Sequence, residues 1–318
     1  MVIPVYNRKN FIEQCLSSVL QQQFSGDYEV IVIDDGSTDG TGEILKQFLP
    51  KIRLHTHGKN EGLSSARNRG IQLSQGRFIA MLDSDCVAAP DWLEKIIQPF
   101  DADSGIMIVG GHVNDAPPRN YWEIVNKGIN FVSHHSGNVE HVIGCNMALR
   151  REFALQNPFD ECPGFAAGDD TELCLRCRCQ GFKVYYTREA AVVHYHRSSF
   201  RSSLTQQFFY GYADAYLSFQ YYSFPYVNFQ IKFWAGIILC LGILFLGFIG
   251  FWWVAVLGFL RVAYVPWYYS GISKAKNLRE RIFTYPGYCI LFIALCLGSL
   301  VYFLFPHAFL NRSKAPLC

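Results

Sequence analysis

The first part of the chain alternates short apolar runs with runs of helical periodicity, and this alternation most constrains the fold. The apolar runs of strand length lie at residues 1–5, 28–33, 52–56 and 78–82, and the helical runs lie between them at 10–23, 41–48 and 63–73. Strands that alternate with helices predict an α/β domain with a largely parallel sheet, because a helix supplies the crossover that parallel neighbours need.

Polar side chains follow three of these apolar runs. They are Pro4-Val5-Tyr6-Asn7, Asp34-Asp35-Gly36-Ser37 and Asp83-Ser84-Asp85. Open parallel sheets bind ligands beyond the carboxyl ends of their strands, so these groups are expected to share one rim. Asp83 and Asp85, two positions apart, can reach one divalent ion, and Mg²⁺ and Mn²⁺ prefer such oxygen ligands. An ordinary Asp-rich turn is the alternative, and Asp34 is expected to form a turn rather than to bind.

The composition changes near residue 231. Half of all residues are hydrophobic, and from 231 to 305 charged residues become sparse. A membrane span needs about 20 apolar residues, and 233–260 contains no charge. We therefore predict a membrane-interface linker over 201–230 and a transmembrane region over 231–306, followed by a tail over 307–318. A buried helix pair in a soluble protein is the alternative.

The order of the predicted spans sets the orientation. We expect a hairpin over about 231–269, a basic loop over 270–282 and a last span over about 283–306. Short basic loops tend to stay in the cytoplasm, and Lys274, Lys276, Arg279 and Arg281 lie in this one. The prediction is a multi-pass membrane protein whose N-terminal domain faces the cytoplasm.

Charge and cysteine content exclude other classes of protein. The net charge of +2 gives no basic surface for nucleic acid. The eleven cysteines are odd in number and scattered, which is not typical of a disulfide framework, so reduced thiols are expected. Cys174, Cys177 and Cys179 are close in sequence but have no second cluster that would complete a zinc site.

Taken together, six stretches resemble the family 2 glycosyltransferases of the GT-A fold, from about Met1 to Arg201. They are VIPVYN (Val2–Asn7), VIDDGSTDG (Val32–Gly40), NEGLSSARNRGI (Asn60–Ile71), AMLDSDC (Ala80–Cys86), GCNMALRREF (Gly144–Phe153) and GDDTELCLRC (Gly168–Cys177). The resemblance implies a Rossmann-like, mostly parallel GT-A catalytic domain over residues 1–200, followed by an all-α transmembrane region.

The resemblance also implies roles in donor binding, with a UDP-sugar as the default nucleotide sugar. Asp35 matches the acidic residue that reads the nucleobase, while Pro4 and Tyr6 border the base pocket. Arg67 matches a residue that steadies the donor near its phosphates, although a solvated charge on a helix face is the alternative. Asp83 and Asp85, with Ser84 between them, match the pair that holds ribose and a Mn²⁺ or Mg²⁺ ion.

Asp170 matches the catalytic base of the family. A sugar hydroxyl is a poor nucleophile, and a carboxylate must take its proton. Asp169 stands where the family usually has Glu, which leaves its role open, and both acids could instead cap the following helix. His194 is expected as the third metal ligand, and His196 competes for that role because alternation would place both on one strand face.

These residues predict an inverting, metal-dependent transferase that adds one sugar to a membrane-associated acceptor, a lipid-linked glycan or a polyprenyl lipid. The Gln-x-x-Arg-Trp motif of processive members is missing at the nearest candidate, residues 206–210. A polyprenyl-phosphate sugar synthase is one alternative. A catalytically silent membrane scaffold that binds nucleotide sugar is another, from a different class.

Overall fold

A computed structural model describes residues 1–126, 135–161, 168–220 and 297. It divides the chain into two compact units, Met1–Pro117 with Asn130–Tyr195 and Pro118–Ile129 with His196–Cys318. The segment from Pro118 to Ile129, which lies inside the predicted 1–200 domain, therefore groups with the second unit.

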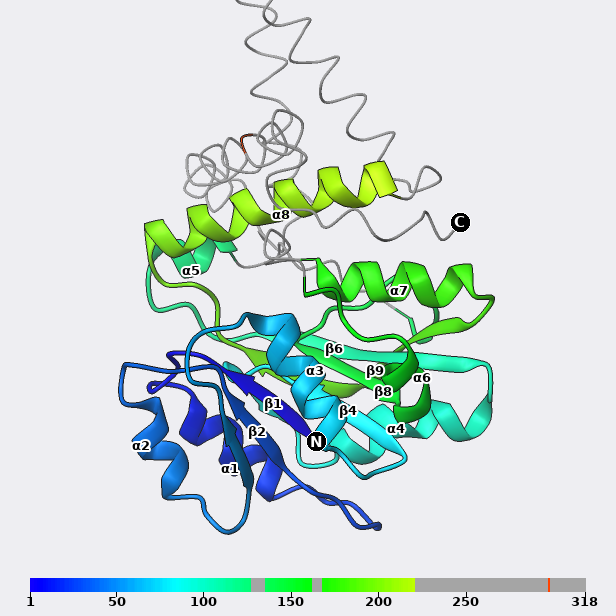
Figure 1. Cartoon of the computed structure of the whole chain (residues 1–318), viewed down its shortest axis with the longest axis horizontal. Coiled ribbons are helices and arrows are strands. Elements are labelled where there is room, and N and C mark those ends of the chain that lie inside the picture. Colours follow the sequence, from blue (N-terminus) through cyan, green and yellow to red (C-terminus); the bar gives the residue numbers. More distant parts are fainter. Residues whose placement is uncertain (127–134, 162–167, 221–296, 298–318) are drawn as a thin grey trace, which may run out of the picture. The chain divides into compact units, whose positions relative to one another are not determined.

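The first unit is built on one mixed sheet with the strand order β3-β2-β1-β4-β8-β6-β9-β5, with β7 paired to β9 (Figure 1). The strands are β1 (Val2–Val5), β2 (Ile31–Asp34), β3 (Arg53–Thr56), β4 (Phe78–Leu82), β5 (Cys86–Ala88), β6 (Ile106–Asp115), β7 (Gly137–Asn138), β8 (Asn146–Arg150) and β9 (Lys183–His194). Strands β3, β2, β1 and β4 run parallel, as the alternating sequence predicts. Strand β8 is antiparallel to both of its neighbours, β4 and β6.

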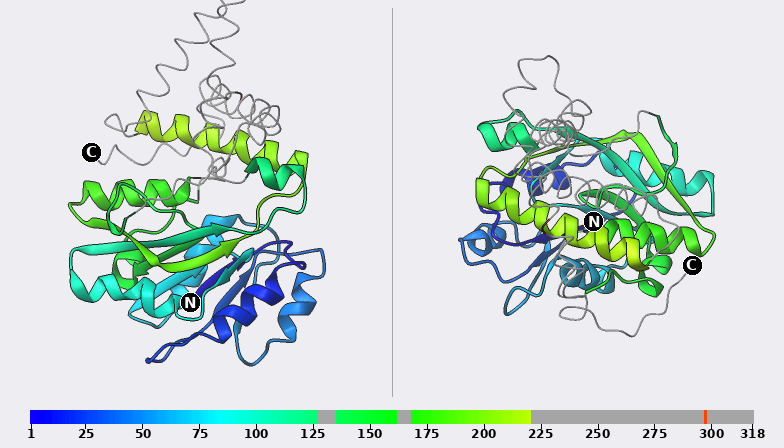
Figure 2. Two further views of the ribbon diagram at one scale, coloured as in Figure 1. Left: turned by 180° about the vertical axis from the view of Figure 1, so that it is seen from behind. Right: turned by 90° about the horizontal axis from the view of Figure 1, so that it is seen from above.

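Helices cover both faces of this sheet, as the views from the front and from behind show (Figures 1 and 2). The helices of the first unit are α1 (Ile12–Leu20), α2 (Thr41–Lys46), α3 (Leu63–Leu73), α4 (Trp92–Ala102), α6 (Arg151–Gln156) and α7 (Asp169–Cys179). One apolar cluster joins the sheet to α1, α2 and α4, and a second joins it to α3, α6 and α7. The fold is therefore a three-layer α/β/α arrangement with a core on each side of the sheet.

Local sequence explains how α1 and α3 pack. Helix α1 buries Ile12, Cys15, Leu16 and Val19, which are spaced for one helix face. Helix α3 approaches β1 closely at Gly70, where an added Cβ would lie 2.2 Å from a methyl group of Val2. Only glycine permits this approach, which brings α3 and its polar N-terminal half against the strands that carry the predicted site.

The predicted bounds of α3 and β4 are confirmed, and most others shift by a few residues. Near the end of the first unit, Lys183–His194 form one twelve-residue strand, β9. Its pairing with β6 skips from Thr187 to Ala191, so a bulge interrupts it without ending it. Helix α4 was missed in the sequence, and it contains Pro99 near its end.

In the second unit the structure describes α5 (Tyr121–Asn126) and α8 (Phe200–Gln220). The Asn126 side-chain amide donates to Ser203 Oγ at 2.8 Å and to the Trp122 carbonyl at 2.8 Å, which ties the two helices together. Trp122 also packs on Phe200, with 5.0 Å between ring centroids.

Within the described part of the chain, no helix combines the length and the hydropathy that a bilayer span requires. The predicted hairpin over 231–269, the basic loop over 270–282, the last span over 283–306 and the tail lie outside the described residues, apart from residue 297. The predicted linker over 201–230 is described only to Gln220, within α8.

Free thiols are found at Cys15, Cys86, Cys145, Cys174 and Cys177, all of them buried. The expectation of reduced thiols is wrong for Cys179, which is disulfide-bonded. Spacing in the sequence carries no information on which cysteines a fold brings together, which is why this bond was missed.

Candidate active site

The parallel strands β1, β2 and β4 end at one rim, and each delivers polar residues to it. The register pairs Val5 with Asp34, so Tyr6 and Asp35 follow neighbouring strand ends. Asp34 Oδ1 accepts the backbone N–H of Ser37 at 3.0 Å, which confirms the turn-forming role predicted for Asp34.

Asp35 is buried and held by three donors. Its Oδ1 accepts the backbone N–H of Glu61 at 2.9 Å and contacts His57 Nδ1 at 2.8 Å, and its Oδ2 accepts the backbone N–H of Gly62 at 2.9 Å. A carboxylate oxygen has two acceptor positions, so these bonds fill Oδ1 and leave one position on Oδ2. Asp35 therefore fixes the loop before α3 and keeps a single acceptor position for a ligand.

The residues predicted to border the nucleobase lie at the end of β1. Pro4 is buried within the strand, and Tyr6 is 42% exposed. Asn7 follows with a φ of 52° and binds the loop after β2, donating from its N–H to Ser37 Oγ and accepting from Thr38 N–H. The exposed Tyr6 ring thus stands on a fixed turn and is available for stacking.

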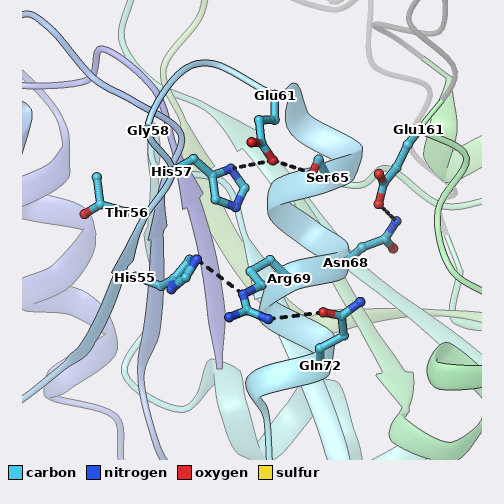
Figure 3. A pocket seen from close by; sticks show the side chains of 10 residues that line it. All are labelled: His55, Thr56, His57, Gly58, Glu61, Ser65, Asn68, Arg69, Gln72 and Glu161. Carbon is cyan, nitrogen blue, oxygen red and sulfur yellow. Dashed lines mark hydrogen bonds and ion pairs between the residues drawn. The ribbon is translucent and has the colours of Figure 1, made fainter.

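A polar pocket of about 460 Å³ lies beside His57, between the end of β3 and the outer face of α3 (Figure 3). Its lining residues are His55, Thr56, His57, Gly58, Glu61, Ser65, Asn68, Arg69, Gln72 and Glu161. The Arg69 guanidinium donates to His55 Nε2 at 3.2 Å and to Gln72 at 3.4 Å. His57 connects this pocket to Asp35 through the contact of its Nδ1 with Asp35 Oδ1.

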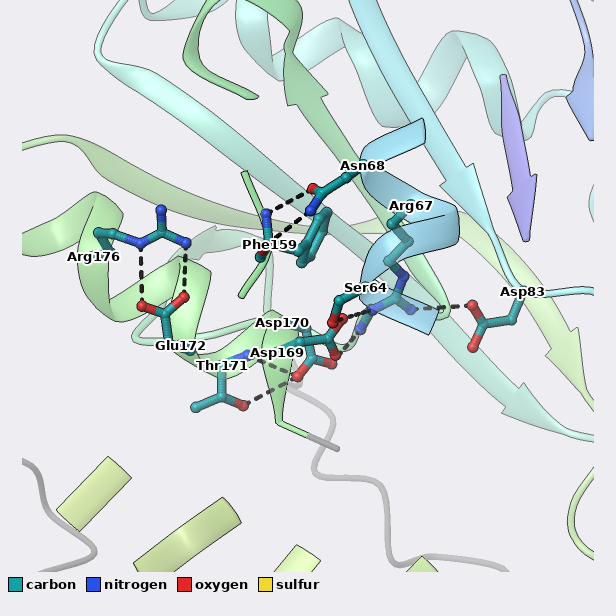
Figure 4. Close-up of polar contacts among 11 residues, drawn as sticks. Ser64, Arg67, Asn68, Asp83, Phe159, Asp169, Asp170, Thr171, Glu172 and Arg176 are labelled. Atoms are coloured by element: carbon teal, nitrogen blue, oxygen red, sulfur yellow. Dashed lines mark hydrogen bonds and ion pairs between the residues drawn. The ribbon is translucent and has the colours of Figure 1, made fainter. Parts of the chain in front are cut away.

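Arg67 is buried and joins acids from distant parts of the chain (Figure 4). Its Nη1 donates to Asp169 Oδ2 at 2.7 Å and its Nη2 to Asp83 Oδ1 at 3.2 Å. Burial alone would lower the pKa of the guanidinium, but Asp169, Asp83 and Asp170 raise it. Arg67 is therefore a fixed cation, and the alternative of a solvated helix-face charge is wrong.

Asp170 is the second residue of α7 and lies beside Arg67. Its Oδ2 accepts the backbone N–H of Gly144 at 2.6 Å, and its Oδ1 accepts the N–H of Thr171 at 2.7 Å and the Thr171 hydroxyl at 3.3 Å. A Cβ built on Gly144 would lie 2.8 Å from Arg67 Nη2 and 3.0 Å from Asp170 Oδ2. Gly144 is thus the close-contact point at which these two side chains meet.

The two acids of α7 have separate tasks, and neither caps the helix. The N-cap is Gly168, without a side-chain cap bond. Asp169 binds Arg67 and Ser64, whereas Asp170 keeps one acceptor position on Oδ2. Burial and the charge of Asp169 raise the pKa of Asp170, while Arg67 and the backbone donors oppose the shift.

Asp85 and His194 form a second group of charged side chains, the Asp85–His194 centre. His194 Nε2 lies 3.5 Å from Asp85 Oδ1, and the Nε of Arg8 lies 3.2 Å from Asp85 Oδ2. Burial would lower the pKa of His194, but the hydrogen bond and charge of Asp85 raise it to about 9. The Cys86 thiol belongs to the same group, because its ligand atom and those of Asp85 and His194 lie within 4.8 Å of one another.

This donor set fits a divalent cation. One carboxylate and one imidazole at 3.5 Å can ligate the same ion after small adjustments, and the remaining positions stay open. The third predicted ligand, Asp83, has its Oδ1 on Arg67 and is not part of the compact Asp85–Cys86–His194 group. His196 begins the second unit.

The structure therefore brings together most of the residues singled out in the sequence. Arg67 connects Asp83 with Asp169 beside Asp170, and Asp85 meets His194. Ser84, between the two acids that follow β4, is buried.

Four residues of the site were missed in the sequence: His57, Arg8, Gly144 and Cys86. His57 follows β3 and Arg8 follows β1, so the strand-end rule that selected Asp35 could have found both. Gly144 lies in the motif GCNMALRREF, but the sequence alone predicted no role for it.

The chain is similar in sequence and fold to known proteins. Residues 1–157 match the profile of Glycosyl transferase family 2. Glycosyltransferase AglE of Haloferax volcanii is 38% identical over 123 residues, which cover 37% of this chain and 40% of that protein. The glucosyl-dolichyl phosphate glucuronosyltransferase of the same organism is 25% identical over 245 residues, which cover 70% of this chain and 77% of that protein.

Among solved structures, mannosyltransferase PcManGT from Pyrobaculum calidifontis, in complex with GDP-Man and Mn²⁺, superimposes with a TM-score of 0.60. The match covers 94% of this chain and 86% of that one at 18% identity, so it shows a shared fold. The profile match shows a glycosyl transferase family 2 domain over residues 1–157, and the chain covers less than half of the length of AglE.

Proposed function

We propose that the protein is an inverting glycosyltransferase that moves one sugar from a nucleotide-diphosphate sugar to a membrane-associated acceptor, with Mn²⁺ or Mg²⁺ as its metal. The observation that carries the proposal is the cluster around Arg67. Asp83 from the end of β4 and Asp169 from the start of α7 bind the same guanidinium, with Asp170 alongside. A site for the leaving nucleotide and a base for the acceptor therefore lie side by side.

Asp170 is the group that takes the proton of the acceptor hydroxyl. Its remaining acceptor position is on Oδ2, and the Gly144 N–H holds this oxygen in place. The raised pKa makes the carboxylate a better base than an exposed Asp, while the charge of Arg67 favours its ionised form. One base with no second nucleophile assigned supports a single displacement with inversion.

The donor would bind along the rim from Tyr6 to Asp83. Asp35 offers one acceptor position on Oδ2, which selects a base edge that presents an N–H, as uracil and guanine do. Tyr6 would stack on that base, and Arg67 would lie near the phosphates. Asp83, Ser84 and Asp85 would face the ribose and diphosphate, with Asp85 and His194 holding the metal.

A divalent ion bound by Asp85 and His194 would act as a Lewis acid that offsets charge on the leaving diphosphate. The Mn²⁺ in the PcManGT structure supports a metal in this protein. GDP-Man in that complex and UDP in a complex of S. aureus TarS support a nucleotide-diphosphate donor, for which a UDP-sugar is our default.

The proposed acceptor is a lipid-linked glycan. The relative named for glucosyl-dolichyl phosphate supports an acceptor that already carries a sugar on a lipid. The apolar residues from 231 to 306 support a multi-pass membrane protein whose catalytic domain faces the cytoplasm, where nucleotide sugars are made.

The test uses the full chain in detergent with several nucleotide sugars, Mn²⁺ or Mg²⁺, and lipid extracts as acceptor. We expect metal-dependent release of nucleoside diphosphate and a lipid product of inverted anomeric configuration. Asp170→Asn should lower kcat about 10²- to 10⁴-fold and leave nucleotide binding within a few-fold. Retained activity in this variant would refute the assignment of the base.

The acceptor is tested separately. Polyprenyl phosphate as sole acceptor distinguishes a polyprenyl-phosphate sugar synthase from a transferase that extends a lipid-linked glycan. Glycosylation of soluble acceptors alone would refute a membrane acceptor. Nucleotide-sugar binding without any turnover would support the scaffold alternative.

A further inference from the structure

A buried thiol, that of Cys86, adjoins the Asp85–His194 centre, and the proposed reaction does not use it. Cys86 directly follows Asp85 and is fully buried. Strand pairing places Cys86 opposite His194 across β5 and β9. Directly opposite residues on antiparallel strands project their side chains to the same face, with Cβ atoms about 4.5–5.5 Å apart. The pairing of β5 with β9 therefore makes the Cys86 thiol and the His194 imidazole neighbours.

The spacing of the donor atoms suits a small tetrahedral ion. With Zn–S near 2.3 Å and Zn–N near 2.0 Å, tetrahedral ligand atoms lie about 3.5 Å apart. His194 Nε2 and Asp85 Oδ1 are 3.5 Å apart, and the Cys86 ligand atom is within 4.8 Å of both. Movements on the order of 1 Å would complete a sulfur, nitrogen and oxygen set around one ion.

A second buried thiol, Cys145, belongs to the same core cluster as Cys86, but its sulfur is not among the ligand atoms that lie within 4.8 Å of one another. Thiolates are soft ligands that Mg²⁺ and Mn²⁺ use poorly and that zinc and cadmium ions favour. Donors of the Cys, His and Asp type therefore match the composition of a zinc site rather than that of a magnesium site.

Charge and access permit such an ion. Arg8 occupies the Oδ2 side of Asp85, whereas Oδ1 faces His194, so a cation can bind Oδ1 while Arg8 keeps Oδ2. The side chains of His194 and Asp85 are 19% and 14% exposed, so an ion can approach the set at these two residues.

We propose that Cys86, Asp85 and His194 form a site for soft divalent cations such as Zn²⁺ and Cd²⁺. Binding releases the proton of the Cys86 thiol and that of the His194 ring nitrogen to water as the sulfur–metal and nitrogen–metal bonds form. Because Asp85 and His194 are shared, a soft ion excludes the oxygen-ligated metal. This last step rests on the proposed function, whereas the binding of the soft ion does not.

The test measures metal binding without substrates. The full chain, stripped of metal by a chelator, is titrated with Zn²⁺ and with Mn²⁺ by calorimetry, and with Co²⁺ by absorption spectroscopy. We expect a sulfur-to-cobalt charge-transfer band. Zn²⁺ binds more tightly than Mn²⁺ at most nitrogen and oxygen sites, so the ratio of their affinities alone decides nothing.

The decisive comparison is between variants. Cys86→Ser should weaken Zn²⁺ binding at least tenfold and remove the cobalt band, while Mn²⁺ affinity changes less than threefold. Cys177→Ser is the matched control, because this buried thiol packs in the opposite core and points at the Lys183 carbonyl. It should keep both the zinc affinity and the band.

Three results would overturn parts of the reasoning in distinguishable ways. A wild-type cobalt complex without the sulfur band refutes the thiol ligand, even if Cys86→Ser and Cys86→Ala fail to fold. Unchanged zinc affinity in a folded Cys86→Ser refutes the site but leaves the Mn²⁺-dependent transfer intact. Failure to bind either Mn²⁺ or Zn²⁺ refutes this inference together with the metal of the proposed function.

Discussion

The substitution Gly144→Ala is the most direct test of the candidate site. A methyl group at this position would lie 2.8 and 3.0 Å from the two terminal nitrogens of Arg67 and 3.0 Å from Asp170 Oδ2. Carbon and its non-bonded neighbours prefer about 3.5 Å or more, so each of these atoms must retreat by about 0.5 Å or more. Gly144 does not have a positive φ, so backbone strain adds nothing and the whole effect of Gly144→Ala acts through the site.

Two magnitudes follow from this displacement. Misplacing a catalytic group by about 1 Å costs about 10²-fold in rate, so we expect kcat of Gly144→Ala to fall by about that factor. Overpacking a buried site costs about 1–3 kcal/mol in the free energy of unfolding. Steady-state transfer kinetics and denaturant unfolding measure the two effects on the same preparation.

The matched control is Gly137→Ala. A Cβ on Gly137 meets no atom within 4 Å, and Gly137 also lacks a positive φ. This variant should keep the kcat and the stability of the wild type. A kcat within twofold of wild type in folded Gly144→Ala would refute the view that Arg67 and Asp170 are held by close contact at this glycine.

Three further predictions concern single contacts. The transfer rate should fall as the pH drops through the raised pKa of Asp170, because the base works only when it is ionised. Asp169→Asn should move this acid limb of the pH–rate profile to lower pH, and an unmoved limb would contradict the effect of Asp169 on the pKa of Asp170. His57→Ala removes a charged hydrogen bond to Asp35 that is worth about 1.5–3 kcal/mol, so the KM for the donor should rise about 10- to 100-fold with kcat little changed, and His57→Asn should recover part of it. Asp85→Asn should raise the Mn²⁺ concentration for half-maximal activity at least about tenfold, as measured by metal titration of activity, and a smaller change would argue against Asp85 as a ligand.

The sequence predicted the parallel half of the sheet well because each of its strands ends in a polar turn. Strand β4 is an uninterrupted apolar run of strand length, and helix α3 has helical periodicity, so the predicted bounds of both are confirmed. Strand β5 is only three residues long and directly follows Asp85, so it offers no periodic pattern. Its pairing with β9 depends on contacts more than a hundred residues apart.

The sequence indicates which residues belong to the site but not which of them contact one another. Asp170 and Asp83 could be selected as acids of the right motifs, yet nothing local indicates that Arg67 binds Asp83 and Asp169 at once. The engagement of Asp35 by His57 and two backbone N–H groups was equally hidden, because it depends on how the loop before α3 folds back on β2. Long-range pairing decides both, and a linear pattern does not encode it.

The bulge in β9 has a consequence for how the chain tolerates changes in length. Between the pairs Gly111–Thr187 and His112–Ala191, β9 contains three extra residues, 188–190. Side chains alternate with a period of two, so an odd number of extra residues inverts which face the following positions present. An insertion or deletion of two residues in this bulge would keep His194 on the same face of the sheet. A change of one residue would move His194 to the opposite face. Whether the number of residues in the bulge is odd or even therefore matters more than which residues they are.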